Sequence, residues 1–221
     1  RRGRARGVGL ARRGAGLVAV GKTRGGPSWK QDDTHALVVA EARTGAQVGR
    51  LKSGDPGVYG RLDEEMDALD AAGIAFSIVP GITAATAAAA SAKVSLTRRG
   101  RNTALRILTG HDVNGFVEHD WRALALPGAT AAIYMGVAAA KFLQGRLLMH
   151  GASPATPMCV VENASAPNQT ITTATLGDLS EQMTAAGVSG PAILFLGLAP
   201  RRALAAVATL SPSPTTALAA G

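Results

Sequence analysis

The chain has 221 residues and a net charge of +8, and 47% of its residues are hydrophobic against 17% charged. That length and composition suffice for a buried core in one large or two small domains. No run approaches 18 uninterrupted apolar residues, which excludes a transmembrane span. The single cysteine, Cys159, excludes an internal disulfide, so we expect a reducing, cytoplasmic setting.

The positive charge is concentrated at the start of the chain. Residues 1–16 are rich in Arg and Gly, contain six arginines and no acid, and account for most of the excess. We expect them to be a disordered head, and the remainder to be nearly neutral. The high overall charge is therefore weak evidence for nucleic-acid binding. The chain does not begin with Met, so we expect it to start partway through a longer reading frame.

The first half of the chain alternates short apolar runs with helical patterns. In Gln31–Arg43, apolar residues recur at helical spacing and acids occupy the first turn, which favours a helix. Similar reasoning predicts strands that alternate with helices through this half of the chain, a pattern that indicates a parallel sheet covered by helices. Its strands are Leu17–Val20, Gln47–Lys52, Phe76–Val79 and Leu105–Thr109, and its further helices are Asp63–Ala72 and Thr83–Ala92.

A second α/β series follows a linker near residues 111–118. Its predicted strands are Thr130–Met135, Met158–Glu162 and Ala192–Leu196, and its predicted helices are Val137–His150 and Leu176–Ala186. The sequence thus predicts two α/β domains, 17–111 and 112–205. Residues 206–221, with their Ser-Pro repeats, are expected to form a disordered tail.

One segment matches a phosphate-binding pattern in an unsuitable context. Gly16 to Thr23 fits the P-loop spacing of Gly, four residues and Gly-Lys-Thr. The four intervening residues form an apolar strand pattern instead of a loop, and a helix-breaking Arg-Gly-Gly-Pro run follows Thr23. We therefore reject an NTPase interpretation.

Two other segments end apolar runs with turns of Gly, Pro and small polar residues. They are Arg50-Leu-Lys-Ser-Gly-Asp-Pro56 and Val79-Pro-Gly-Ile-Thr-Ala84. Such turns are typical of strand ends that bind ligands in α/β proteins. With further motifs in the same order, the chain resembles the tetrapyrrole methylases, and within them the uroporphyrinogen-III C-methyltransferases. Those motifs include Gln31-Asp-Asp33, Tyr59-Gly-Arg61, Thr109-Gly-His111, Tyr134-Met-Gly136, Val161-Glu-Asn-Ala164 and Gly190-Pro-Ala192.

The resemblance, which covers about residues 18–200, implies a fold of two α/β domains with a cofactor cleft between them. It implies two methyl transfers from S-adenosylmethionine to ring carbons of uroporphyrinogen III, giving precorrin-2 and S-adenosylhomocysteine. The pathway implied is siroheme and cobalamin biosynthesis, and a homodimer is implied. The family's first strand, its Gly-rich loop and its assigned general base have no counterpart here, so the first domain is expected to lack its N-terminal strand.

The resemblance also assigns roles to individual residues. It implies that Lys22 is a proton donor, and it implies substrate contacts for Arg61, Arg98 and Arg99, whose guanidinium groups suit carboxylates. Cofactor contacts are implied for Ser53, Gly54, Asp55, Val58, Thr83, Ala84, Met135 and Ala164.

The residues alone allow plainer roles as well. Gly54-Asp55 can be an ordinary turn, Thr83 an N-cap, Met135 a core residue, and Lys22 a solvated side chain. No His/Cys cluster has the spacing of a metal site, so no metal is expected. Two alternative functions stay open: methylation of another corrinoid precursor, and a non-catalytic remnant whose Arg-rich head binds RNA, which the lack of aromatic residues in 1–16 disfavours.

Overall fold

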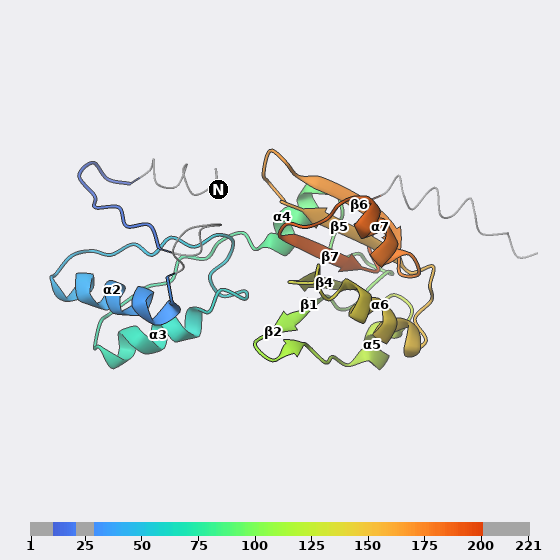
Figure 1. Ribbon diagram of the computed structural model, residues 1–221, viewed down its shortest axis with the longest axis horizontal. Helices are drawn as coiled ribbons and strands as arrows, with labels where there is room; N and C mark the ends of the chain where they lie inside the picture. Colours follow the sequence, from blue (N-terminus) through green and yellow to red (C-terminus); the bar gives the residue numbers. More distant parts are fainter. Residues whose placement is uncertain (1–10, 21–28, 201–221) are drawn as a thin grey trace, which may run out of the picture. The chain divides into compact units, whose positions relative to one another are not determined.

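The computed structural model describes residues 11–20 and 29–200, and the predicted tail, most of the predicted head and Lys22 lie outside them. The chain divides into two compact units, Arg1–Thr83 (unit 1) and Ala84–Gly221 (unit 2) (Figure 1). The sequence analysis had placed this boundary between residues 111 and 112.

Unit 1 contains two helices among its described residues. Helix α2 is Gln31–Arg43 and helix α3 is Leu62–Ala71, as predicted to within one residue. Each has acids in its first turn, where they interact favourably with the helix dipole. Each is followed closely by a glycine with positive φ, Gly45 at 84° and Gly73 at 66°, a conformation that ends helices. The helices pack against each other.

The three strands predicted for unit 1 are wrong. Within the described residues of this unit, Leu17–Val20, Gln47–Lys52 and Phe76–Val79 form no sheet. Their apolar side chains stay in contact with solvent: Val79 is 80% exposed and Leu17 62%. A strand needs a neighbouring strand to bond its amides, and apolar character alone does not supply one.

Unit 2 is built on a five-stranded mixed sheet in the order β1-β4-β7-β5-β6. Strand β1 pairs in parallel with β4, whereas the other neighbouring strands pair antiparallel. Four of these strands were predicted, and β6 was not. The strands are β1 Arg106–Thr109, β4 Ala131–Tyr134, β5 Pro157–Glu162, β6 Thr170–Thr175 and β7 Ala192–Leu196.

Helices cover both faces of this sheet. The predicted helices are present as α4 Ala84–Ser91, α6 Ala140–Met149 and α7 Leu179–Ala185, and the short α5 Trp121–Ala125 is additional. Residues of α5, α6 and α7 form one core with Ile133, Val160 and Leu194. Helix α4 contacts β4, β5 and β7 through buried alanines, whose small size lets the helix approach the sheet closely.

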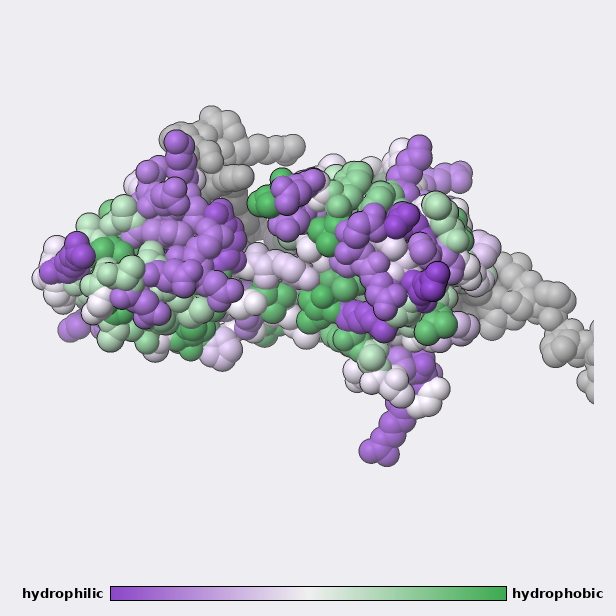
Figure 2. Space-filling model, turned by 90° about the horizontal axis from the view of Figure 1, so that it is seen from below, coloured by the Kyte–Doolittle hydropathy of each residue, from purple (hydrophilic) through white to green (hydrophobic). Residues whose placement is uncertain are grey.

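A two-stranded hairpin, β2 His111–Asp112 and β3 Gly115–Phe116, follows β1 where a linker was expected. Because β1 pairs with β4 in register, it belongs to the sheet of unit 2. Figure 2 shows hydrophobic residues interspersed with hydrophilic ones on the visible surface of each unit. Across the described ranges, no helix is both long and apolar enough to cross a membrane.

Candidate functional site

Asp55 joins the two loops that the sequence analysis singled out in unit 1. Its Oδ1 accepts a hydrogen bond from the Gly57 amide at 2.8 Å, and its Oδ2 accepts one from the Gly81 amide at 2.9 Å. The Gly-Asp-Pro loop therefore lies against the Val-Pro-Gly-Ile-Thr segment, although 26 residues separate Asp55 from Gly81. In this structure, both oxygens of the Asp55 carboxylate bind backbone amides and so hold the two loops together.

Two glycines make this arrangement possible, because the backbone facing them leaves no room for a side chain. A Cβ on Gly81 would lie 2.2 Å from the Gly54 carbonyl oxygen, and a Cβ on Gly60 would lie 2.3 Å from that of Pro56. Close approach of backbone to backbone is a use for which only glycine is suited. The loop of residues 53–59 is thereby folded tightly on itself and onto residue 81.

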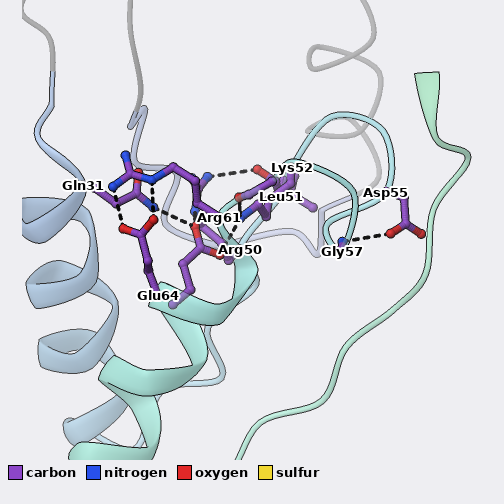
Figure 3. A network of polar contacts seen from close by, with 10 residues as sticks. Gln31, Arg50, Leu51, Lys52, Asp55, Gly57, Arg61 and Glu64 are labelled. Carbon is purple, nitrogen blue, oxygen red and sulfur yellow. Dashed lines mark hydrogen bonds and ion pairs between the residues drawn. The ribbon is translucent and has the colours of Figure 1, made fainter. Parts of the chain in front are cut away.

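Charged side chains hold the base of this loop (Figure 3). Lys52 Nζ donates to the Gly60 carbonyl oxygen and pairs with Glu65 Oε2 at 2.9 Å. Glu65 Oε1 also accepts a hydrogen bond from Gln31 Nε2 at 3.3 Å and forms an ion pair with Arg50 Nε at 3.4 Å. The Glu65 carboxylate on α3 thus joins this helix to α2 and to residues 50–52.

Arg61, an expected substrate contact, is engaged by its own helix. It precedes α3 with φ of 56°, and its Nε donates to Glu64 Oε1 at 2.6 Å. The hydrogen bond to Glu64 raises the pKa of Arg61, a side chain that is always charged in proteins. Both side chains are about half exposed, so an external carboxylate can compete for this guanidinium.

In unit 2, three strands end at the same edge of the sheet. Strands β1 and β4 are parallel, and β4 and β5 are both antiparallel to β7, so their carboxyl ends point the same way. The segments that follow them contain Gly110, Met135 and Ala164. The topology therefore gathers three of the motifs noted in the sequence, two of which carry expected cofactor contacts.

The backbone is left-handed at the two non-glycine residues that immediately follow strands at this edge, and at Ser165 just beyond. Met135 and Asn163, which immediately follow β4 and β5, have φ of 50° and 51°. Such left-handed conformations are uncommon outside glycine and concentrate at functional sites. Met135 is 52% exposed, so the core role that its residue type alone allowed is wrong. Its thioether is available to a ligand.

The N-terminus of α4 is tied to β4 through Tyr134. The Ala85 amide donates to the Tyr134 hydroxyl at 2.9 Å, so one of the first amides of this helix is already satisfied. Ala84, expected to contact the cofactor, is the first residue of α4, and Thr83 is the last residue of unit 1. The hydroxyl of Tyr134 sets the position of Ala84 relative to strand β4, which Met135 immediately follows.

Glu162, the last residue of β5, joins the start of the segment that contains Ala164 to residues 189–190 and to the start of β6. Its Oε1 accepts hydrogen bonds from the Ser189 amide at 2.9 Å and from the Gly190 amide, and its Oε2 accepts one from Thr170 Oγ1 at 3.1 Å. These bonds, chiefly those from the Ser189 and Gly190 amides, lower the pKa of the Glu162 carboxyl. The charged form is therefore favoured in the folded state.

This lowered pKa predicts an acid-dependent contribution to stability. A carboxyl with a depressed pKa in the folded state stabilises the fold above its unfolded pKa, about 4.3 for Glu, and that stabilisation is lost as pH falls through the folded pKa. We expect Glu162→Gln to cost about 1–3 kcal/mol at pH 7 and to make the free energy of unfolding less dependent on pH below 4.3. Urea unfolding between pH 3 and pH 7 measures this, and identical pH dependence in both proteins would contradict it.

Arg98 and Arg99 are exposed on a loop organised by a residue that the sequence analysis overlooked. Asn102 Oδ1 accepts from the Arg98 amide at 3.0 Å, and its Nδ2 donates to the carbonyl oxygens of Leu96 and Ala104. Burial lowers the pKa of the neighbouring Arg101, and the charge of Arg98 adds to this effect. The loop therefore concentrates positive charge within unit 2.

The expected site residues fall into two sets. Unit 1 contains Ser53, Gly54, Asp55, Val58, Arg61 and Thr83, and unit 2 contains Ala84, Arg98, Arg99, Met135 and Ala164. Lys22 lies outside the described residues. Within the described part of the chain, no three His, Cys, Asp or Glu side chains are grouped as metal ligands.

Sequence reasoning assigned no role to Lys52, Glu65, Tyr134 or Glu162. Lys52, Tyr134 and Glu162 lie inside motifs quoted above for the resemblance, so their positions carried a signal, whereas Glu65 lies outside those motifs. Their functions depend on partners that are remote in sequence, and residue spacing does not identify those partners.

A family model described as "Tetrapyrrole (Corrin/Porphyrin) Methylases" matches residues 11–180. Among curated proteins, the chain is similar to the siroheme synthase of Pseudoalteromonas translucida, with 43% identity over 188 residues, and to that of Gluconacetobacter diazotrophicus, with 44% over 187. These alignments cover 85% and 84% of this chain and 40% of each relative. The chain thus spans well under half the length of these relatives.

Solved structures give a consistent result. A uroporphyrin-III C-methyl transferase from Thermus thermophilus, complexed with S-adenosylhomocysteine, has a TM-score of 0.65 and 31% identity, covering 82% of this chain and 75% of that one. A cobalamin biosynthetic enzyme, cobalt precorrin-4 methyltransferase, has a TM-score of 0.70 and 28% identity, covering 76% and 71%.

Proposed function

Because the chain belongs to the tetrapyrrole (corrin/porphyrin) methylases, we propose that it transfers methyl groups from S-adenosylmethionine to uroporphyrinogen III. The observation that carries the proposal is that the Asp55 carboxylate joins the Gly-Asp-Pro loop to the Val-Pro-Gly-Ile-Thr segment by hydrogen bonds to Gly57 and Gly81. The strained backbone at Met135 and Asn163 gives independent support from unit 2.

The residues present fit the cofactor that the family uses. S-adenosylmethionine supplies an electrophilic methyl group on a sulfonium, together with a carboxylate and an adenosine. An exposed thioether and small residues in tight turns suit adenosine, because backbone can approach it closely. We propose that the cofactor is held by Ser53, Gly54, Asp55, Val58, Thr83, Ala84, Met135 and Ala164.

Arginines and one lysine are proposed to act on the substrate. Uroporphyrinogen III carries eight carboxylates, and Arg61, Arg98 and Arg99 can bind carboxylates through paired N–H donors. Arg61 would exchange its exposed partner Glu64 for a substrate carboxylate. We propose that Lys22 is a proton donor in the reaction, the role that the family resemblance implies for it.

Titration calorimetry with S-adenosylhomocysteine tests cofactor binding directly. We expect micromolar affinity and, in a methyl-transfer assay on uroporphyrinogen III, a Lys22→Ala variant that keeps this affinity but turns over at least about 100-fold more slowly. A folded protein that does not bind S-adenosylhomocysteine would refute the proposal. Equal turnover by Lys22→Ala would remove Lys22 from the mechanism.

A second candidate substrate is a later corrinoid, favoured by the TM-score of 0.70 to the precorrin-4 enzyme. The higher identity to the uroporphyrin-III enzyme, 31% against 28%, favours the first. Assays with both substrates in parallel decide between them. We also propose a homodimer, which light scattering of the purified chain checks.

A further inference from the structure

The loop of residues 53–59 depends on side chains for its position. In the described residues of unit 1, no strand ladder anchors the segments on either side of the loop. The bond of Asp55 with Gly57 fixes its shape, and the bond of Asp55 with Gly81 joins it to the Val-Pro-Gly-Ile-Thr segment, but neither attaches it to the two helices. The attachment must come from elsewhere.

Lys52 and Glu65 supply that attachment. Lys52 immediately precedes the loop, and its ammonium bonds the carbonyl of Gly60, which immediately follows it, so one side chain closes the loop at its base. The same ammonium pairs with Glu65 on α3 at 2.9 Å. The loop is therefore fastened to a helix through a single cation.

Glu65 has two further partners, a hydrogen-bond donor and an ion-pair partner. Gln31 reaches it from the first turn of α2, and Arg50 reaches it from the segment before the loop. The side chains of Lys52 and Glu65 are only 13% and 12% exposed. A pair so far removed from solvent is weakly screened. Removal of Glu65 leaves the Lys52 ammonium without its carboxylate partner, and removal of Lys52 leaves Glu65 with Arg50 and Gln31 but frees the loop from α3.

We propose that Lys52 and Glu65 are positioning residues that set the affinity for S-adenosylmethionine by holding the loop of residues 53–59 in its binding conformation. This inference rests on the proposed function for the identity of the ligand. It goes beyond that function because neither residue contacts the cofactor in the proposal: they act through Asp55 and its neighbours.

Unit 2 offers a matched control. Glu118 pairs with Arg146 at 2.8 Å, but Glu118 is 63% exposed and its partners are in unit 2. Glu118→Gln therefore removes an ion pair of similar length without touching the loop. Lys52→Arg keeps the cation, whereas Lys52→Met keeps an unbranched side chain and removes the charge.

The experiment compares the full chain with Glu65→Gln, Lys52→Met, Lys52→Arg and Glu118→Gln by two measurements. Hydrogen exchange of peptides covering residues 53–60 reports the loop itself, without any ligand. Calorimetry with S-adenosylhomocysteine reports affinity. We expect Glu65→Gln and Lys52→Met to exchange at least tenfold faster in this loop and to bind at least tenfold more weakly, with exchange in β4, β5 and β7 unchanged.

The control variants separate the effect of the Lys52–Glu65 pair from the general effect of removing a charge. Lys52→Arg is expected to recover most of the protection, and Glu118→Gln to match the unsubstituted chain in both measurements. Unchanged exchange at residues 53–60 in both Glu65→Gln and Lys52→Met would overturn the inference, whatever the affinity. Absence of binding by the unsubstituted chain would refute the proposed function instead, and the exchange data would still decide the role of the pair.

Discussion

Replacing Gly81 with alanine is expected to weaken binding of S-adenosylhomocysteine by about 100-fold or more. The new Cβ would lie 2.2 Å from the Gly54 carbonyl oxygen, and that atom is backbone, so it cannot move aside without shifting the whole loop. The shift would also break the bond from the Gly81 amide to Asp55. Titration calorimetry of the purified variant measures the loss.

Gly49→Ala provides the comparison for this substitution. Gly49 lies in the same unit, and a Cβ built on it meets no atom within 4 Å. We expect its affinity to stay within about twofold of the unsubstituted chain. If Gly81→Ala bound as tightly as Gly49→Ala, the contact between the two loops would have no part in cofactor binding.

Phe195→Ala is expected to lower the free energy of unfolding by about 3–5 kcal/mol. Phe195 is fully buried on β7, the central strand, and lies in register between Ala132 of β4 and Cys159 of β5. Its small neighbours cannot expand into the cavity that truncation leaves. Urea unfolding followed by the fluorescence of the buried Trp121 in the same unit measures the change.

Ile171→Ala tests whether this cost comes from burial. Ile171 is on the edge strand β6 and is 40% exposed, so we expect a loss of less than about 1 kcal/mol. A Phe195→Ala variant no less stable than Ile171→Ala would show that the centre of the sheet repacks freely.

The sequence predicted helices more reliably than it predicted strands. Helix α2 was placed to the residue, because its acidic first turn and its terminal glycine mark both ends locally. Whether Phe76–Val79 becomes a strand depends on a partner elsewhere in the chain, which a local pattern does not report. Strand β6 was missed for a related reason: its Thr-rich sequence has no apolar run, and pairing with β5 creates it.

The same distinction applies to the candidate site. The segments that contain Asp55 and Gly81 were recognisable because their Gly and Pro residues are local signals. That Asp55 bonds Gly81 was not, because hydrogen bonds between remote segments have no pattern in sequence. The predicted parallel sheet was wrong for unit 1, and the sheet of unit 2 is mixed because β7 enters between β4 and β5.

The place of β7 in the sheet also determines how late in synthesis the sheet of unit 2 can form. Among the residues that the structure describes it is the last strand in sequence but the central one in the sheet, so β4 and β5 cannot pair with their shared neighbour until residue 196 has been synthesised. Until then their apolar residues have no native partner on that side. Domains whose central strand is synthesised so late expose apolar segments during synthesis, which favours aggregation of incompletely synthesised chains.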